Sequence, residues 1–326
     1  MPPVSTHAAR NRILPEPTAA KVPEIIFLFW VVKVLTTCGG EAVSDYLALG
    51  NRQVGAAVET GLLVIALIWQ FSTRRYVAAA YWSLAYAIAI FGTGVSDALH
   101  LFAGIPYAGT TLLWAVVLAL VFWLWYRSEG TLSIHSIVTR RREAYYWAVV
   151  FATFALGTAL GDFTASVLGL GYLASALMFA GIIGIPALLW SRFGLNAVAA
   201  FWFAYVVTRP LGASFADYFG RARSLSGAGF GSGRVALIVA VAVAIGVAYL
   251  AITRRDVQPP VPAAPRAASE GFRQARAGRL LISPWVSRGH GQDQALGHWQ
   301  AQESRVVRTA ASAFHQDKPG EPARRP

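Results

Sequence analysis

Charged residues are scarce in this 326-residue chain, and cysteine is nearly absent. Asp, Glu, Lys and Arg make up 13% of the residues, whereas soluble domains carry roughly 25%. Hydrophobic residues make up 56%, so the composition indicates a protein whose solvent is largely lipid. The single cysteine, Cys38, excludes an internal disulfide framework and argues against a cysteine-rich metal site.

Motifs of the common enzyme classes are missing as well. The chain contains no H-E-x-x-H, no G-x-S-x-G, no P-loop and no Cys/His cluster. Leu160-Gly161-Asp162 resembles the Gly-Asp pair of intramembrane aspartyl proteases, but Ala159 stands where that motif needs a glycine. We therefore expect neither an enzyme nor a bound cofactor.

Eight hydrophobic stretches approach the roughly 20 residues that a helix needs to cross the hydrocarbon core. They cover about 24–45, 54–72, 78–99, 108–126, 145–165, 172–190, 197–218 and 233–252. The sequence thus predicts an all-α integral membrane protein with eight transmembrane helices, whose main partner is the lipid bilayer. We expect an N-terminal segment over 1–22, a transmembrane domain over 23–253, and a basic, mostly disordered tail over 254–326.

The net charge of +12 is compatible with nucleic-acid binding, but its distribution favours a topological role. Positive residues gather at one set of span ends, which the positive-inside rule assigns to the cytoplasm. These residues are Arg10, Arg12, Lys21, Arg74, Arg75, Arg127, Arg140, Arg141, Arg142, Arg192, Arg254 and Arg255. The opposite ends hold fewer, namely Arg52, Arg221, Arg223 and Arg234. We expect a multi-pass protein of the bacterial inner membrane with both termini cytoplasmic, and no nucleic-acid partner.

An internal repeat is the most informative feature of the sequence. Four segments align: FWVVKVLTTCGGEAVSD (29–45), YWSLAYAIAIFGTGVSD (81–97), YWAVVFATFALGTALGD (146–162) and FWFAYVVTRPLGASFAD (201–217). Each has an aromatic–Trp pair, a glycine ten residues after the Trp, and an aspartate fifteen after it. The tryptophans are Trp30, Trp82, Trp147 and Trp202; the glycines are Gly40, Gly92, Gly157 and Gly212; the aspartates are Asp45, Asp97, Asp162 and Asp217.

Each repeat holds two spans, over about 24–72, 78–126, 145–190 and 197–252, so all four copies enter the membrane in the same direction. Fifteen residues of helix cover about 22 Å, which separates the Trp from the Asp by most of a membrane span. We expect the Trp near the cytoplasmic interface and the Asp toward the outer end. The faces around the Asp carry mostly small residues, so we expect the odd-numbered spans to pack around one another with these faces inward.

The repeat motif and the connecting segment 128–137 (SEGTLSIHSI) resemble a family of bacterial membrane proteins. That family is defined by a repeat of unknown function and is labelled only as membrane-anchored. The resemblance covers about residues 22–252 and implies a multi-span membrane fold, but it implies no substrate and no catalytic residue. The first repeat departs from the pattern after its Asp, where Gly50-Asn51 replaces a longer turn.

The four repeat aspartates allow two interpretations. In the structural one, each carboxylate hydrogen-bonds neighbouring groups and joins adjacent repeats. In the functional one, the carboxylates converge on a shared site for protons or for a hard cation such as Mg²⁺, Ca²⁺ or Mn²⁺. The two interpretations are compatible.

Three intramembrane charges occur in single copies: Glu41, Glu59 and Arg209. Glu41 precedes Asp45 by one helical turn and shares its face. Arg209 lies deep in its span and is expected to pair with Glu41, with Glu59 or with one of the aspartates. Together with the four aspartates, these residues are our candidates for a solute or ion path. The leading hypothesis is a small secondary transporter for a cation or small solute, and the alternative is a non-transporting membrane scaffold or sensor.

Overall fold

The computed structural model describes residues 17–258, and within this range the regular secondary structure is helical. The helices are α1 (Phe27–Ala48), α2 (Arg52–Ser72), α3 (Ala78–Leu101), α4 (Tyr107–Glu129), α5 (Arg140–Asp162), α6 (Gly171–Ile182), α7 (Gly184–Phe193), α8 (Ala197–Gly220) and α9 (Ser232–Thr253). Short turns of helix are η1 (Ile134–Ser136), η2 (Phe163–Val167) and η3 (Arg223–Leu225). With α6 and α7 counted as one span, eight helical spans are long and apolar enough to cross a membrane. The predicted eight-span, all-helical membrane fold is confirmed, and the predicted disordered tail lies almost entirely outside the described residues.

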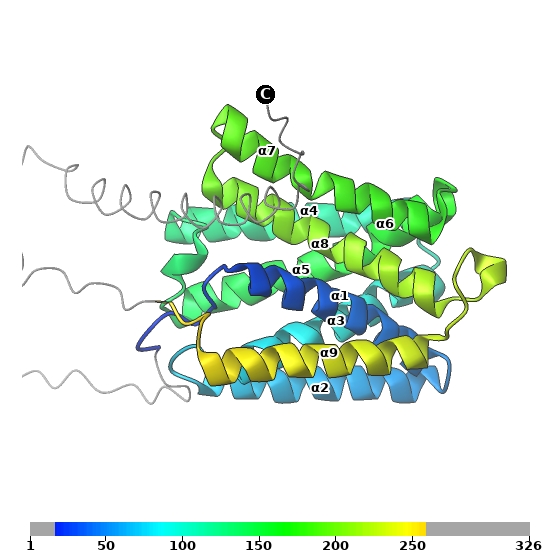
Figure 1. Ribbon diagram of the computed structural model, residues 1–326, viewed down its shortest axis with the longest axis horizontal. Coiled ribbons are helices and arrows are strands. Elements are labelled where there is room, and N and C mark those ends of the chain that lie inside the picture. Colours follow the sequence, from blue (N-terminus) through cyan, green and yellow to red (C-terminus); the bar gives the residue numbers. More distant parts are fainter. Residues whose placement is uncertain (1–16, 259–326) are drawn as a thin grey trace, which may run out of the picture. The chain divides into compact units, whose positions relative to one another are not determined.

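The first helix of every repeat belongs to an inner ring. Helices α1, α3, α5 and α8 contact one another in cyclic order, and α8 returns to α1. Figure 1 shows these four between α4, α6 and α7 on one side and α2 and α9 on the other. The expected packing of the odd-numbered spans around one another is therefore confirmed.

The second helix of each repeat packs on the outside, mainly against the inner helix of the next repeat. Helix α2 lies on α3, α4 lies on α5, α6 and α7 lie on α8, and α9 closes the circle on α1. The inner helices bury 56–78% of their most apolar stretch and the outer ones 22%. Exposed apolar side chains are what a lipid-facing helix presents, because the bilayer solvates them.

The inner helices all run in the same direction. We call the end where they begin the Trp end and the end where they finish the Asp end. At the Asp end, Gly104 and Gly169 both adopt a left-handed conformation, with φ of 66° and 69°, so the matching turns of repeats two and three are structurally equivalent. Repeat one differs as expected: Asn51 caps α2 by accepting from the amides of Gln53 and Val54.

The third repeat departs from the others on both of its helices. Helix α5 continues through η2, a π-helical turn that follows Asp162 directly, and such turns are frequent at functional sites. Its outer span is divided at Ile183 into α6 and α7. Pro186 explains the break, because proline lacks the N–H that would bond the carbonyl of Ile182.

Residues 17–26 form a strap across the Trp end. Backbone bonds join Thr18 to Arg74 (2.7 Å), Tyr76 to Ala20 (3.0 Å) and Lys21 to Ile137 (3.1 Å). The amine of Lys21 is fully buried and lies 3.1 Å from Glu143. Burial lowers the pKa of Lys21, and the Glu143 carboxylate opposes that shift. Lys21 therefore holds the bundle end together, instead of being one of the solvated charges that orient a span.

Candidate functional site

Two sets of contacts repeat around the inner ring and fix its register. The aromatic residue before each Trp contacts the Trp of the next repeat. The ring centroids are 5.6 Å apart for Phe29–Trp82, 5.2 Å for Tyr81–Trp147, 6.0 Å for Tyr146–Trp202 and 5.8 Å for Phe201–Trp30. Trp82, Trp147 and Trp202 are buried. These three rings pack against a neighbouring repeat, and the expected level of the tryptophans near the cytoplasmic interface stays a prediction.

The repeat glycines make the second set of contacts. We write +7 for the residue seven after each Trp, and likewise for other positions. Each glycine, at +10, lies against the +7 residue of the next repeat: the pairs are Gly40–Ala89, Gly92–Phe154, Gly157–Arg209 and Gly212–Thr37. The glycines let the four helix backbones approach closely, so the ring closes in register without an axial slip.

Positions +7, +11 and +15 are four residues apart, so they share one helical face and form layers about 6 Å apart. The +11 layer holds Glu41, Thr93 and Thr158, with Ala213 as the fourth member. The +15 layer holds the four aspartates. Charged side chains are therefore stacked along the middle of the inner ring.

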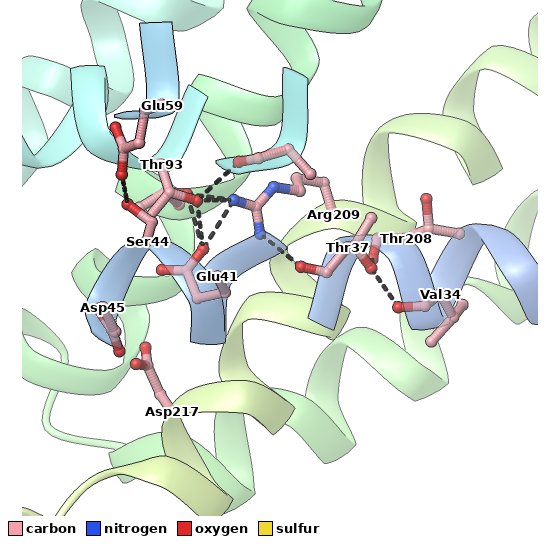
Figure 2. Close-up of polar contacts among 12 residues, drawn as sticks. Val34, Thr37, Glu41, Ser44, Asp45, Glu59, Thr93, Thr208, Arg209 and Asp217 are labelled. Carbon is pink, nitrogen blue, oxygen red and sulfur yellow. Dashed lines mark hydrogen bonds and ion pairs between the residues drawn. The ribbon is translucent and has the colours of Figure 1, made fainter. Parts of the chain in front are cut away.

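The centre of the site is an ion pair between Glu41 of α1 and Arg209 of α8 (Figure 2). Nη2 of Arg209 lies 2.7 Å from Oε2 of Glu41, and the two side chains are 0% and 1% exposed. Of the partners that the sequence allowed for Arg209, the structure thus selects Glu41. The ring order explains this choice, because α8 and α1 are direct neighbours.

Two threonines complete the coordination of this pair. The hydroxyls of Thr93 and Thr158 donate to Oε2 of Glu41 at 2.9 and 3.0 Å. Arg209 donates to both hydroxyl oxygens in turn, at 2.7 Å for Thr158. One oxygen of Glu41 thus collects donors from all three other inner helices. Sequence analysis missed both threonines, although they occupy the +11 position that Glu41 holds in repeat one.

A second polar layer lies at the Asp end. Carboxylate oxygens of Glu41, Asp45 and Asp217 lie within 4.8 Å of one another, and Figure 2 shows Asp45 and Asp217 facing each other. We call these three residues the carboxylate group. Their chemistry fits a hard cation or shared protons. The predicted proximity of Glu41 and Asp45 is confirmed.

Asp97 and Asp162 stand at the same register on α3 and α5 but outside the carboxylate group. Asp97 and Asp162 are near enough to each other and to Glu41 for like-charge repulsion. The structure therefore brings two of the four repeat aspartates into one candidate site and leaves the other two beside it.

Arg221 balances part of this negative charge. Its Nε lies 2.6 Å from Asp217 and its Nη2 lies 3.7 Å from Asp45. Arg221 follows the last residue of α8, and its side chain is 29% exposed. The sequence analysis counted it only as a loop charge, because nothing in a Gly/Ser-rich segment indicates that it folds back on the aspartates.

Glu59 reaches the same end of the bundle from the outer helix α2. Its Oε1 accepts from Ser44 at 2.7 Å, and its side chain packs against Gly94. The absence of a side chain at Gly94 makes room for the carboxylate. Glu59 thus borders the site without pairing with Arg209.

Lys33 is a further intramembrane charge, which the sequence analysis overlooked. It lies at +3 on α1, is 1% exposed, and has its Nζ 4.0 and 4.1 Å from the ring centroids of Tyr205 and Phe154. A lysine only three residues after Trp30 could reach the membrane surface by extending its side chain, but Lys33 is buried in the ring instead. Repeat alignment alone marks it, since Ala85, Val150 and Tyr205 stand at the same position.

The fold and the site together define a multi-pass helical membrane protein with four two-helix repeats around a polar axis. A family model described as Repeat of Unknown Function (DUF347) matches residues 28–76, 80–131, 145–195 and 200–256. These segments cover more than half of the chain and coincide with the four structural repeats, so the chain belongs to this family. Neither a curated protein nor a solved structure was found to match it.

Proposed function

We propose that this protein is a small cation transporter whose path follows the axis of the inner ring. The observation that carries the proposal is the carboxylate group, formed by residues of α1 and α8 that are far apart in the chain. Buried oxygen ligands of this kind favour protons and hard divalent ions. In a membrane, intramembrane ionisable residues are costly to bury, so they usually mark an ion or substrate path.

The Glu41–Arg209 pair supports a mechanism for such a path. A guanidinium is a permanent positive charge, and here it occupies one oxygen of Glu41. A cation entering the carboxylate group competes with Arg209 for that carboxylate. Binding and release of the cation would then be coupled to a rearrangement between α1 and α8.

We further propose that the membrane is a bacterial inner membrane and that both chain ends are cytoplasmic. The excess of Lys and Arg around the Trp end supports this orientation. In that case the carboxylate group lies toward the outer side, and the aromatic layer at the Trp end lies toward the cytoplasm.

A non-transporting scaffold is the second candidate. The aromatic–Trp and glycine contacts favour it, because they recur in all four repeats and serve packing. The scaffold hypothesis gives the aspartates a packing role as well.

Flux measurements on the purified full chain in liposomes separate the two candidates. Mg²⁺, Mn²⁺, Ca²⁺ and H⁺ would be followed with encapsulated indicators for the wild type and for Glu41→Gln, Asp45→Asn and Asp217→Asn. Loss of one good ligand, worth about 1.4 kcal/mol or more, lowers affinity about tenfold. The matched control is Glu129→Gln, because Glu129 pairs with Arg141 and Arg142 away from the axis.

Transport predicts a cation flux that falls in the three site variants while their folding and membrane content stay normal. Glu129→Gln is expected to keep the wild-type flux. A wild type that moves none of these ions, with site variants that lose folded protein, contradicts transport and favours the scaffold.

A further inference from the structure

Lys33 differs from every other buried cation in the described part of the chain. Lys21 pairs with Glu143 and Arg209 with Glu41, and the partly exposed Arg221 pairs with Asp217. The amine of Lys33 is buried, and within residues 17–258 it has neither a hydrogen-bond acceptor nor an acidic partner. Its Nζ lies over the faces of two aromatic rings, those of Phe154 and Tyr205.

A protonated Lys33 leaves this region with an excess of positive charge. The guanidinium of Arg209 lies 5.2 Å from the centroid of the same Phe154 ring that Lys33 contacts. Arg209 and Lys33 repel each other, and Glu41 is already paired with Arg209. Glu41 is the carboxylate paired with Arg209, and Lys33 adds a second cation beside that pair. Cation–π contacts offset only part of the cost of burying an unpaired charge.

The other groups that neighbouring helices bring toward Lys33 offer no negative charge at neutral pH. They are Tyr205 and Arg209 on α8. Further along the inner ring toward the Trp end, Tyr81 on α3 and Tyr146 on α5 share a hydrogen bond. Helix α9, which also packs on α1, carries Arg234 and Tyr249 as its ionisable residues. Lysine can lose its proton to relieve such an excess, whereas arginine cannot.

We propose that Lys33 is the proton-carrying residue of a cation–proton exchange cycle. The inference rests on the proposed function. A cation bound at the carboxylate group draws Glu41 away from Arg209, and the guanidinium, no longer neutralised by Glu41, then repels the ammonium of Lys33 more strongly than in the paired state. The amine releases one proton to water at the Trp end and takes one up again when the cation leaves. One N–H bond breaks as one O–H bond to water forms, and uptake reverses both changes.

Two substitutions at this position give opposite results if the proposal holds. Lys33→Met is unbranched, only one atom shorter than lysine, and suits the aromatic surroundings, but its side chain has no titratable proton. Lys33→Arg keeps a fixed charge. Lys21→Arg is the matched control, because it makes the same change at a buried lysine that has an acidic partner.

The first experiment measures Mn²⁺ flux in liposomes with and without a pH gradient of about one unit, which is a tenfold proton ratio. The pH gradient should drive Mn²⁺ flux through the wild type and through Lys21→Arg. Lys33→Met should still conduct Mn²⁺, but its flux should change less than about twofold when the pH gradient is applied. The flux through Lys33→Arg should fall about tenfold or more. If the pH gradient drives Mn²⁺ flux through Lys33→Met as it does through the wild type, the proposal is overturned.

The second experiment counts protons released when Mn²⁺ binds the protein in detergent, from binding enthalpies in buffers of different ionisation enthalpy. The wild type should release about one proton more than Lys33→Met. Equal release from both overturns the role of Lys33 while leaving cation transport intact. Absence of both Mn²⁺ binding and flux in the wild type defeats the proposed function and the Lys33 cycle together.

Discussion

Alanine at the repeat glycines tests the ring register directly. A Cβ added at three of these glycines would have at least two atoms of the next repeat closer than 3.0 Å; these are Gly40, Gly157 and Gly212. At Gly40 and Gly212 the crowding includes backbone atoms, at 2.9 Å in both cases. At Gly92 the nearest atom is Cβ of Phe154 at 3.0 Å and the next is a backbone nitrogen at 3.4 Å. Gly61, on the outer helix α2, has nothing within 4 Å.

The expected change in the free energy of unfolding of each variant follows from two opposing effects. Alanine is better than glycine in a helix interior by about 1 kcal/mol. Inserting a methyl group into a well-packed interface costs about 1–3 kcal/mol, and it is near the upper end where backbone atoms must move. Gly61→Ala should therefore stabilise the protein by up to about 1 kcal/mol. Gly92→Ala should be close to neutral, and the three crowded variants should lose up to about 2 kcal/mol.

Thermal unfolding of the purified variants in one detergent, followed by far-UV circular dichroism, measures this order. The midpoint should be highest for Gly61→Ala, close to wild type for Gly92→Ala, and lowest for the three crowded positions. If Gly40→Ala, Gly157→Ala and Gly212→Ala unfold at the same temperature as Gly61→Ala, the +10 to +7 contacts are wrong and the ring register with them.

Two further predictions concern buried charges. Arg209→Gln leaves the carboxylate of Glu41 unpaired and should lower the free energy of unfolding by about 3–5 kcal/mol; adding Glu41→Gln should recover much of that loss. At the Trp end, Asp256 accepts from Tyr76 through Oδ2, while its buried Oδ1 has no partner in the described part of the chain. Burial raises the pKa of Asp256, so the folded state binds a proton more readily than the unfolded state. Local stability is then greatest below the ordinary aspartate pKa of about 4 and falls as pH rises through the raised value. Hydrogen exchange of the Glu24 amide, which donates to the Asp256 carbonyl, should accelerate beyond its intrinsic rate as pH rises above the ordinary aspartate pKa of about 4 in the wild type but not in Asp256→Asn.

The architecture was predictable because the repeat leaves little freedom. An aromatic–Trp pair, a glycine and an aspartate recur at constant spacing, and two spans per repeat force the inner helices to run in the same direction. The contacts between particular helices were harder to predict from the sequence. The outer helix of each repeat packs mainly on the next inner helix, an arrangement that no spacing within one repeat reveals.

The site was only partly predictable for a related reason. Glu41, Asp45, Asp217 and Arg209 were recognised as unusual intramembrane residues, but the partner of Arg209 depends on the order of helices around the ring. Thr93 and Thr158 are unremarkable in hydropathy and gain their role only when the +11 positions are brought together. Arg221 reaches the aspartates through the path of the chain after α8, which composition does not encode.

A double variant that replaces the Glu41–Arg209 ion pair can separate the contribution of this pair to folding from its contribution to transport. In the double variant Glu41→Thr with Arg209→Met, the +11 position of repeat one matches Thr93 and Thr158, and an apolar side chain fills the space beside Gly157. Replacing a buried ion pair by apolar or small groups is often neutral or stabilising by about 1–4 kcal/mol, so the double variant should unfold at the wild-type temperature or above it. Cation flux should nevertheless be lost, since neither the Glu41 ligand nor the competing guanidinium remains. A well-folded double variant that carries Mn²⁺ at the wild-type rate would show that the charged pair lies outside the path, because a scaffold tolerates this exchange and a transport site does not.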